Sequence, residues 1–133
     1  MENELVCLDT SLLIDYFRKT NKANSHLFKL TQNYSHFAVS VITQYEIYVG
    51  SNIEQDLFWD QFFEKMVILP FDSKANLEAV SIYRSLKKKN QLIDIPDLLI
   101  DATAIAHSLK LATLDEKHFS RIEGIELISV NTM

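Results

Sequence analysis

Residues 95–115 read IPDLLIDATAIAHSLKLATLD, and the order of elements in this stretch decides the fold. Pro96 suits the first turn of a helix, and Asp97 beside it complements the helix dipole. Alanines at 102, 104 and 106 would let that helix pack closely on a sheet. The run KLATLD (110–115) then reads as a strand that ends in a turn at Asp115. A helix that leads directly into such a strand indicates an α/β fold.

The rest of the chain repeats this alternation of strands and helices. We expect strands at residues 4–8, 36–40, 66–70, 110–115 and 126–130. We expect helices after Thr10 and Ser11, over 23–33, between Ser40 and Gly50, over 53–65, from Asp72 to near Asn90, from Pro96 onward, and near 116–121. This order predicts a parallel sheet with helices on both faces, within a single domain of residues 1–133.

The composition fits a compact domain. Of 133 residues, 47% are hydrophobic, which is enough for a full core, and there are only two glycines and two prolines. The single cysteine, Cys7, lies in an apolar run and has no partner for an internal disulfide, which is typical of a reducing cytoplasm. We see neither a signal peptide nor a stretch of 18 or more apolar residues, so we expect no membrane span.

Four acidic residues stand at the edges of the apolar segments: Asp9, Glu46, Asp97 and Asp115. Each has an ordinary interpretation by itself, as a helix cap, a solvent-facing residue, a partner of a helix dipole or the start of a turn. In a parallel sheet, however, the strands' carboxyl ends lie on one edge, where ligands bind. Carboxylates that converge there repel one another unless a cation neutralises them. The pattern therefore predicts a site for a hard divalent cation with oxygen ligands.

Asp101 lies four residues after Asp97, so on a helix the two carboxylates project from nearly the same face, about 6 Å apart. Two like charges at this spacing disfavour a helix unless a positive charge lies nearby. A bound cation would supply that charge, and so would a Lys or Arg from another segment.

The remaining charged and aromatic residues have structural interpretations. The basic run of Arg84 and Lys87–Lys89 reads as a solvated helix end, with a phosphate-contacting rim as the alternative. The aromatic residues between 58 and 63 read as core or as a subunit contact. The four histidines show no metal-binding spacing and are interpreted as surface or hydrogen-bonded residues: His26, His36, His107 and His118.

Three stretches resemble a PIN domain of the toxin type, in the VapC-like group of toxin–antitoxin ribonucleases. LVCLDTSLLIDYF (5–17) is similar to the opening strand, acid and helix of that family. SVITQYEIYVG (40–50) is similar to its second acidic segment, and residues 95–128 are similar to its closing segment. The resemblance implies a three-layer α/β/α sandwich around a central, mainly parallel sheet of four to five strands.

The resemblance also implies an activity, a metal dependence and partners. It implies an endoribonuclease that hydrolyses RNA phosphodiester bonds with one or two Mg²⁺ or Mn²⁺ ions, and that is paired with a protein antitoxin and commonly homodimeric. Asp9 and Asp97 would hold the principal ion, and Glu46 and Asp115 would bind directly or through water. Thr10, Ser11 and Thr113 would support these acids. Asp101 stands where the family usually has Ala, so it is either an extra acid behind the ligands or a surface acid with its own basic partner.

Two other functions fit a similar sheet. A phosphatase of the Asp-nucleophile class would need a second acid two residues after the strand-end Asp9, and this chain has Ser11 there. A catalytically silent PIN-like module that binds RNA or protein would not need all four acids. Metal titration separates the silent module from the enzyme, because only the enzyme should be stabilised by Mg²⁺ or Mn²⁺.

Overall fold

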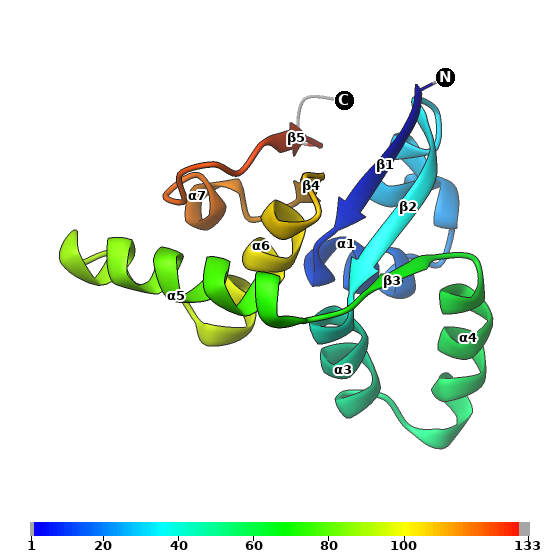
Figure 1. Ribbon diagram of the computed structural model, residues 1–133. Coiled ribbons are helices and arrows are strands. Elements are labelled where there is room, and N and C mark those ends of the chain that lie inside the picture. Colours follow the sequence, from blue (N-terminus) through cyan, green and yellow to red (C-terminus); the bar gives the residue numbers. More distant parts are fainter. Residues whose placement is uncertain (1, 131–133) are drawn as a thin grey trace.

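The computed structural model describes residues 2–130, and in it five parallel strands form one sheet in the order β3-β2-β1-β4-β5 (Figure 1). The strands are β1 (Glu2–Leu8), β2 (Tyr34–Ser40), β3 (Val67–Leu69), β4 (Lys110–Thr113) and β5 (Leu127–Ser129). The helices are α1 (Thr10–Arg18), α2 (His26–Leu30), α3 (Val41–Val49), α4 (Ile53–Glu64), α5 (Ser73–Lys88), α6 (Ile95–Ala106) and α7 (Glu116–Phe119), with a 3-10 turn η1 (Lys22–Asn24). The predicted α/β class and parallel sheet are confirmed.

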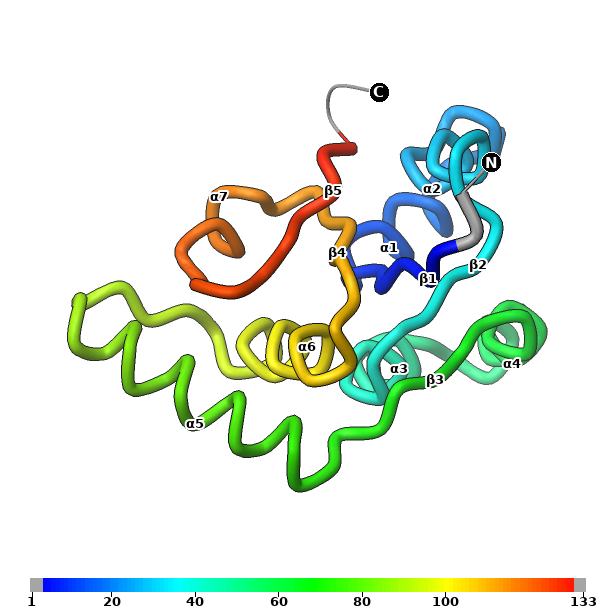
Figure 2. Tube along the Cα trace, turned by 45° about the horizontal axis from the view of Figure 1, so that its top comes forward, coloured from blue at the N-terminus to red at the C-terminus, as the bar shows by residue number. Residues whose placement is uncertain are grey.

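Both faces of the sheet are buried, because successive side chains of a strand point to opposite faces. In β1, Val6 and Leu8 belong to a core with α1, α2 and α4, whereas Cys7 belongs to a second core with α5 and α6. The two helical layers lie on opposite sides of the sheet in Figure 2. This is the predicted three-layer arrangement.

Most helices begin at a polar residue that caps them. The side chains of Asp9, Ser25, Ser40, Asn52 and Asp72 each accept a hydrogen bond from a backbone N–H two or three residues further on. Asp9 and Ser40 come directly at the ends of β1 and β2. The sequence thus turns from strand to helix at the carboxyl edge of the sheet and leaves polar side chains there.

The helix expected over 23–33 is two elements in the structure. Ser25 ends the 3-10 turn η1 and caps α2, since its buried hydroxyl donates to the Lys22 carbonyl at 2.7 Å and accepts from Phe28 N–H at 3.1 Å. The strand expected at 66–70 covers only Val67–Leu69 at the edge of the sheet, where Pro70 has no N–H to extend the ladder.

The direction in which successive strands are added to the sheet reverses between β1 and β4. From β1 the chain moves outward through β2 and β3, and from β4 it moves the other way to β5. In open parallel sheets, ligands bind outside the carboxyl ends of the strands at such a switch point. Asp9 follows β1 and Asp115 lies two residues beyond β4, and these two strands are hydrogen-bonded neighbours.

The aromatic residues between 58 and 63 belong to the core, as one of the two interpretations had it. Trp59 and Phe63 are buried, and the Trp59 ring stacks on Phe17 and Phe63 at centroid distances of 5.3 and 5.8 Å. Within residues 2–130, no helix combines the length and the apolar character that crossing a bilayer requires.

Candidate metal centre

Asp9 is fixed through one of its two carboxylate oxygens. Its Oδ2 accepts hydrogen bonds from Ser11 Oγ at 2.7 Å and from Thr113 Oγ1 at 2.8 Å. The side chain is only 4% exposed, and Oδ1 is buried with no hydrogen-bond partner in the described part of the chain. A buried carboxylate oxygen without a donor is costly unless something positive meets it. Asp9 therefore has one positioned and one available ligand atom.

The two hydroxyls that hold Asp9 are themselves held by the backbone after β4. Ser11 Oγ accepts from Leu114 N–H at 3.1 Å, and Thr113 Oγ1 accepts from Asp115 N–H at 2.9 Å. The start of α1 and the turn after β4 are thus joined through Asp9. Ser11 and Thr113 lie where they can support the acids, as the sequence analysis expected.

Glu46 is turned toward the same edge by Thr10. Thr10 Oγ1 donates to Glu46 Oε1 at 2.8 Å and lies 3.0 Å from Thr43 Oγ1. Thr43 is buried in the first turn of α3, and its backbone N–H donates to the Ser40 side chain that caps this helix. Glu46 is therefore a held side chain and not a free surface acid.

Asp97 lies in the first turn of α6, and the charges of all three other predicted acids act on its carboxyl group. Burial raises the pKa of Asp97 to about 6, and the charges of Asp9, Glu46, Asp94 and Asp115 add to this effect. Each like charge disfavours ionisation of its neighbour. The four acids predicted from the sequence do converge, and a divalent cation would relieve their repulsion.

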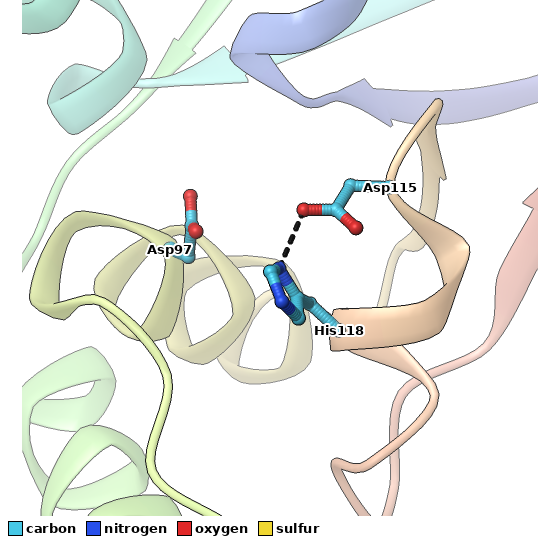
Figure 3. A group of neighbouring side chains, drawn as sticks. All are labelled: Asp97, Asp115 and His118. Carbon is cyan, nitrogen blue, oxygen red and sulfur yellow. Dashed lines mark hydrogen bonds and ion pairs between the residues drawn. The ribbon is translucent and has the colours of Figure 1, made fainter.

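Asp97 and Asp115 also share their space with a histidine (Figure 3). Ligand atoms of Asp97, Asp115 and His118 all lie within 4.8 Å of one another. His118 Nδ1 is 2.7 Å from Asp115 Oδ2. The interpretation of His118 as a surface or hydrogen-bonded residue agrees with its exposure and its contact with Asp115, but it did not include the nearness of Asp97. The available signal was its place three residues after Asp115, which puts both side chains on one face of a helical turn.

Asp101, one turn after Asp97 on α6, is completely buried. Both of its carboxylate oxygens lack a hydrogen-bond partner among residues 2–130. Burial first, and then the charges of Asp9 and Asp97, raise the pKa of Asp101 to about 9. Burial, with Asp9 and Asp101, likewise raises the pKa of the Cys7 thiol to about 12. The interpretation of Asp101 as a surface acid with a basic partner is wrong, because α6 turns this side chain into the interior.

The residues present fit a divalent cation. The donor set is mainly carboxylate, and Asp9 Oδ1 is an orphaned buried acceptor at the sheet's switch point. Hard divalent ions take oxygen ligands of this kind. Asp9, Asp97, Asp115 and Glu46 are the side chains that would hold the ion.

The basic run at the end of α5 is a solvated helix end. Lys87 and Lys88 lie in the last turn of α5, where positive charge complements the helix dipole. Lys89 pairs with Glu123 at 3.0 Å.

Comparison with known proteins places this chain among a group of related sequences. The family model described as PIN domain matches residues 6–125. Ribonuclease VapC1 of Methanocaldococcus jannaschii is 34% identical over 135 residues, covering 95% of this chain and 87% of that protein. Ribonuclease VapC1 of Rickettsia felis is 31% identical over 113 residues, covering 77% of this chain and 84% of that protein.

Solved structures show the same fold. The VapBC2 complex of Rickettsia felis, bound to a DNA fragment from its promoter, contains a chain with a TM-score of 0.77 and 26% identity, covering 94% of this chain and 98% of that one. A chain of DNA-bound VapBC from Salmonella typhimurium gives a TM-score of 0.83 at 24% identity, covering 97% and 99%. The family match spans Asp9, Glu46, Asp97 and Asp115, the acids that meet at the carboxyl edge of the sheet. The chain belongs to the PIN domain family.

Proposed function

We propose that this protein is a metal-dependent endoribonuclease that hydrolyses RNA phosphodiester bonds and acts as the toxin of a toxin–antitoxin pair. The observation that carries the proposal is the Asp9 carboxylate, whose Oδ2 is fixed by Ser11 and Thr113 while the buried Oδ1 stays unpartnered. The names of the related ribonucleases support the activity.

Asp9 and Asp97 hold the principal ion, and Glu46 and Asp115 complete the pocket directly or through water. When bound, the cation neutralises phosphoryl charge, orients water and lowers its pKa. We propose Mg²⁺ or Mn²⁺, in one or two sites, because all four acids offer oxygen. The negative net charge of −5 is no obstacle, since several of these acids face the cation and not the RNA.

The chain's other residues keep these ligands in place. Ser11 and Thr113 fix Asp9 Oδ2 and leave Oδ1 without a donor. Thr10 fixes Glu46 Oε1, which leaves the second carboxylate oxygen to accept a hydrogen bond from the attacking water. Asp101 lies one turn after Asp97 on α6 and adds a buried acidic group whose pKa responds to the charges of Asp9 and Asp97.

The two competing functions fit the site less well. The position that a second acid would occupy in an Asp-nucleophile phosphatase holds Ser11, and its hydroxyl is engaged with Asp9. A catalytically silent RNA- or protein-binding module has no need for four converging acids.

Partners belong to the same proposal. The neighbouring VapBC complexes support a protein antitoxin. A homodimer is supported by large apolar side chains along α3 and α4, where Tyr45, Val49, Ile53 and Leu57 are 64–89% exposed. We propose that residues 1–133 act as a single domain and that the protein works in the cytoplasm, where its RNA substrate is found.

The test is substitution of the two principal ligands. Asp9→Asn and Asp97→Asn should abolish cleavage of RNA in Mg²⁺. The fold should stay intact or become more stable, because carboxylate repulsion is relieved. The measurement is RNA cleavage, with the melting temperature recorded on the same samples. Glu54→Gln, at an exposed acid in the first turn of α4, is the control and should retain activity. Full activity in either ligand variant contradicts the proposal. An unsubstituted protein that neither cleaves RNA nor is stabilised by Mg²⁺ or Mn²⁺ favours the silent module.

A further inference from the structure

The side chain of His118 is the one group in the site that is not an oxygen donor. It lies in the short helix α7, three residues after Asp115, and is 46% exposed, as Asp115 is 43% exposed. A hydrated ion can therefore reach both. The other histidines are engaged elsewhere: His26 with Asp15, His36 with Ser35, and His107 with the Thr103 carbonyl.

The spacing of the three ligand atoms is close to that of one coordination sphere. Metal–ligand bonds of about 2.1 Å place neighbouring ligands of an octahedral ion about 3.0 Å apart and opposite ligands about 4.2 Å apart. His118 Nδ1 and Asp115 Oδ2 are 2.7 Å apart, and the group with Asp97 lies within 4.8 Å. An ion between them would need only small movements of the side chains in Figure 3.

A second observation, independent of this cluster, points to a ligand at the same place. Asp9 is 4% exposed, and its buried Oδ1 has no hydrogen-bond partner among the described residues. Its charge acts on Asp97, one member of the cluster. The carboxylate that carries this orphaned acceptor thus lies near enough to Asp97 for its charge to act on that member of the cluster.

We propose that His118 coordinates the cation through Nδ1, so that the centre is a mixed nitrogen–oxygen site. This rests on the proposed metal centre and specifies its preferred ion. Imidazole suits transition ions such as Fe²⁺, Ni²⁺ and Zn²⁺ and binds Mn²⁺ more weakly than these, whereas Mg²⁺ prefers oxygen. The His118 ligand therefore selects Mn²⁺ and related transition ions over Mg²⁺. In the competing arrangement His118 only holds Asp115 by a hydrogen bond and leaves the ion with oxygen ligands.

Pulsed electron paramagnetic resonance on the full chain loaded with Mn²⁺ tests the assignment. The unsubstituted protein and His107→Ala should show hyperfine coupling from a ligand nitrogen, and His118→Ala should lose it. Calorimetry with each metal alone provides a second readout. His118→Ala should weaken Mn²⁺ binding by about 10-fold or more, while Mg²⁺ binding changes less than about 3-fold.

The outcomes separate this inference from the proposed function. Binding of Mn²⁺ without nitrogen coupling in the unsubstituted protein overturns the role of His118 and leaves the carboxylate centre standing. Equal weakening of Mg²⁺ and Mn²⁺ in His118→Ala also overturns it, because a residue that only positions Asp115 affects both ions alike. Failure to bind either metal overturns both proposals.

Discussion

Asp9 serves two purposes because its two oxygens face different surroundings. Oδ2 accepts from the Ser11 and Thr113 hydroxyls and, at 3.4 Å, from Ser11 N–H, so it belongs to the cap of α1. Oδ1 has no such donor and is buried. The ordinary interpretation as a helix cap and the functional one as a ligand are therefore compatible. A cap that is also a ligand is held more rigidly than a free side chain, which favours a preorganised site.

Asp101 should destabilise the metal-free protein increasingly as the pH rises. Its pKa is raised to about 9 in the folded protein. Between about pH 4 and about pH 9 the unfolded chain releases this proton while the folded protein retains it, so the free energy of unfolding falls as the pH rises through this range. Asp101→Ala removes that penalty and introduces a good helix former in α6.

We expect Asp101→Ala to raise the free energy of unfolding by about 1–3 kcal/mol near pH 8 and by less near pH 5. Urea unfolding at the two pH values, without divalent metal, measures the difference. Asp94→Ala, which removes an exposed acid at the start of the same helix, is the control. A loss of stability near pH 8 would show that Asp101 has a stabilising partner that its burial does not suggest.

At the scale of elements, α6 decides the character of the site. Its first turn presents Asp97 to the other acids, and its small residues Ala102, Ala104 and Ala106 are buried, as the sequence predicted. Close packing of this helix on the sheet places Asp101 in the interior. The residues that allow the close approach also create the unusual environment of this acid.

The end of α1 depends on a lysine from the following turn. Lys22 Nζ donates to the carbonyls of Tyr16, Phe17 and Lys19 at 2.7, 2.9 and 2.9 Å. It also lies 5.1 Å from the centroid of the Tyr16 ring. A positive charge satisfies the free carbonyls at a helix C-terminus and complements its dipole. Lys22 therefore anchors the turn between α1 and α2.

Lys22→Met keeps the aliphatic stem but loses these charge-assisted hydrogen bonds. We expect it to lower the free energy of unfolding by about 2 kcal/mol. Lys29→Met, on the exposed side of α2, should stay within about 0.5 kcal/mol of the unsubstituted protein. Thermal or urea unfolding of the three proteins measures these differences. Equal stabilities would show that water hydrogen-bonds to the carbonyls equally well.

Helices and strands are predictable where residues close together in the sequence determine them. Short segments rich in apolar residues predict strands at 4–8, 36–40 and 110–115. The structure has strands there, at Glu2–Leu8, Tyr34–Ser40 and Lys110–Thr113. The segment 23–33 has apolar residues at helical spacing throughout, so periodicity alone predicts one helix. The division at Ser25 comes from hydrogen bonds of its hydroxyl on both sides, and the pattern of apolar residues does not contain that information.

At the scale of the whole molecule, two apolar cores hold the sheet from both faces, and the acids gather at its carboxyl edge. Like-charged acids therefore repel one another at one edge of an otherwise well-packed domain. Any ligand that binds the folded state and not the unfolded chain stabilises the protein by mass action. We expect a divalent cation to do so here by neutralising the repulsion.

We expect Mg²⁺ or Mn²⁺ to raise the melting temperature, with about 2.7 kcal/mol of stabilisation when the free ion is at about 100 times its dissociation constant. This increase in melting temperature should disappear in Asp97→Asn. Differential scanning calorimetry at matched ionic strength, with NaCl replacing the divalent salt, separates site binding from screening. A divalent salt that raises the melting temperature no more than NaCl does would contradict the proposed metal centre.

The sequence by itself determined the kinds of elements and the acids at their ends, because capping, periodicity and burial are read from residues close together along the chain. Only the tertiary structure decided that β1 and β4 lie side by side, that Asp101 is buried, and that His118 meets Asp97 and Asp115. These facts depend on which segments pack together across the whole sheet. Local residue spacing does not contain that information, because contacts between side chains distant in sequence arise only from the packing of both cores.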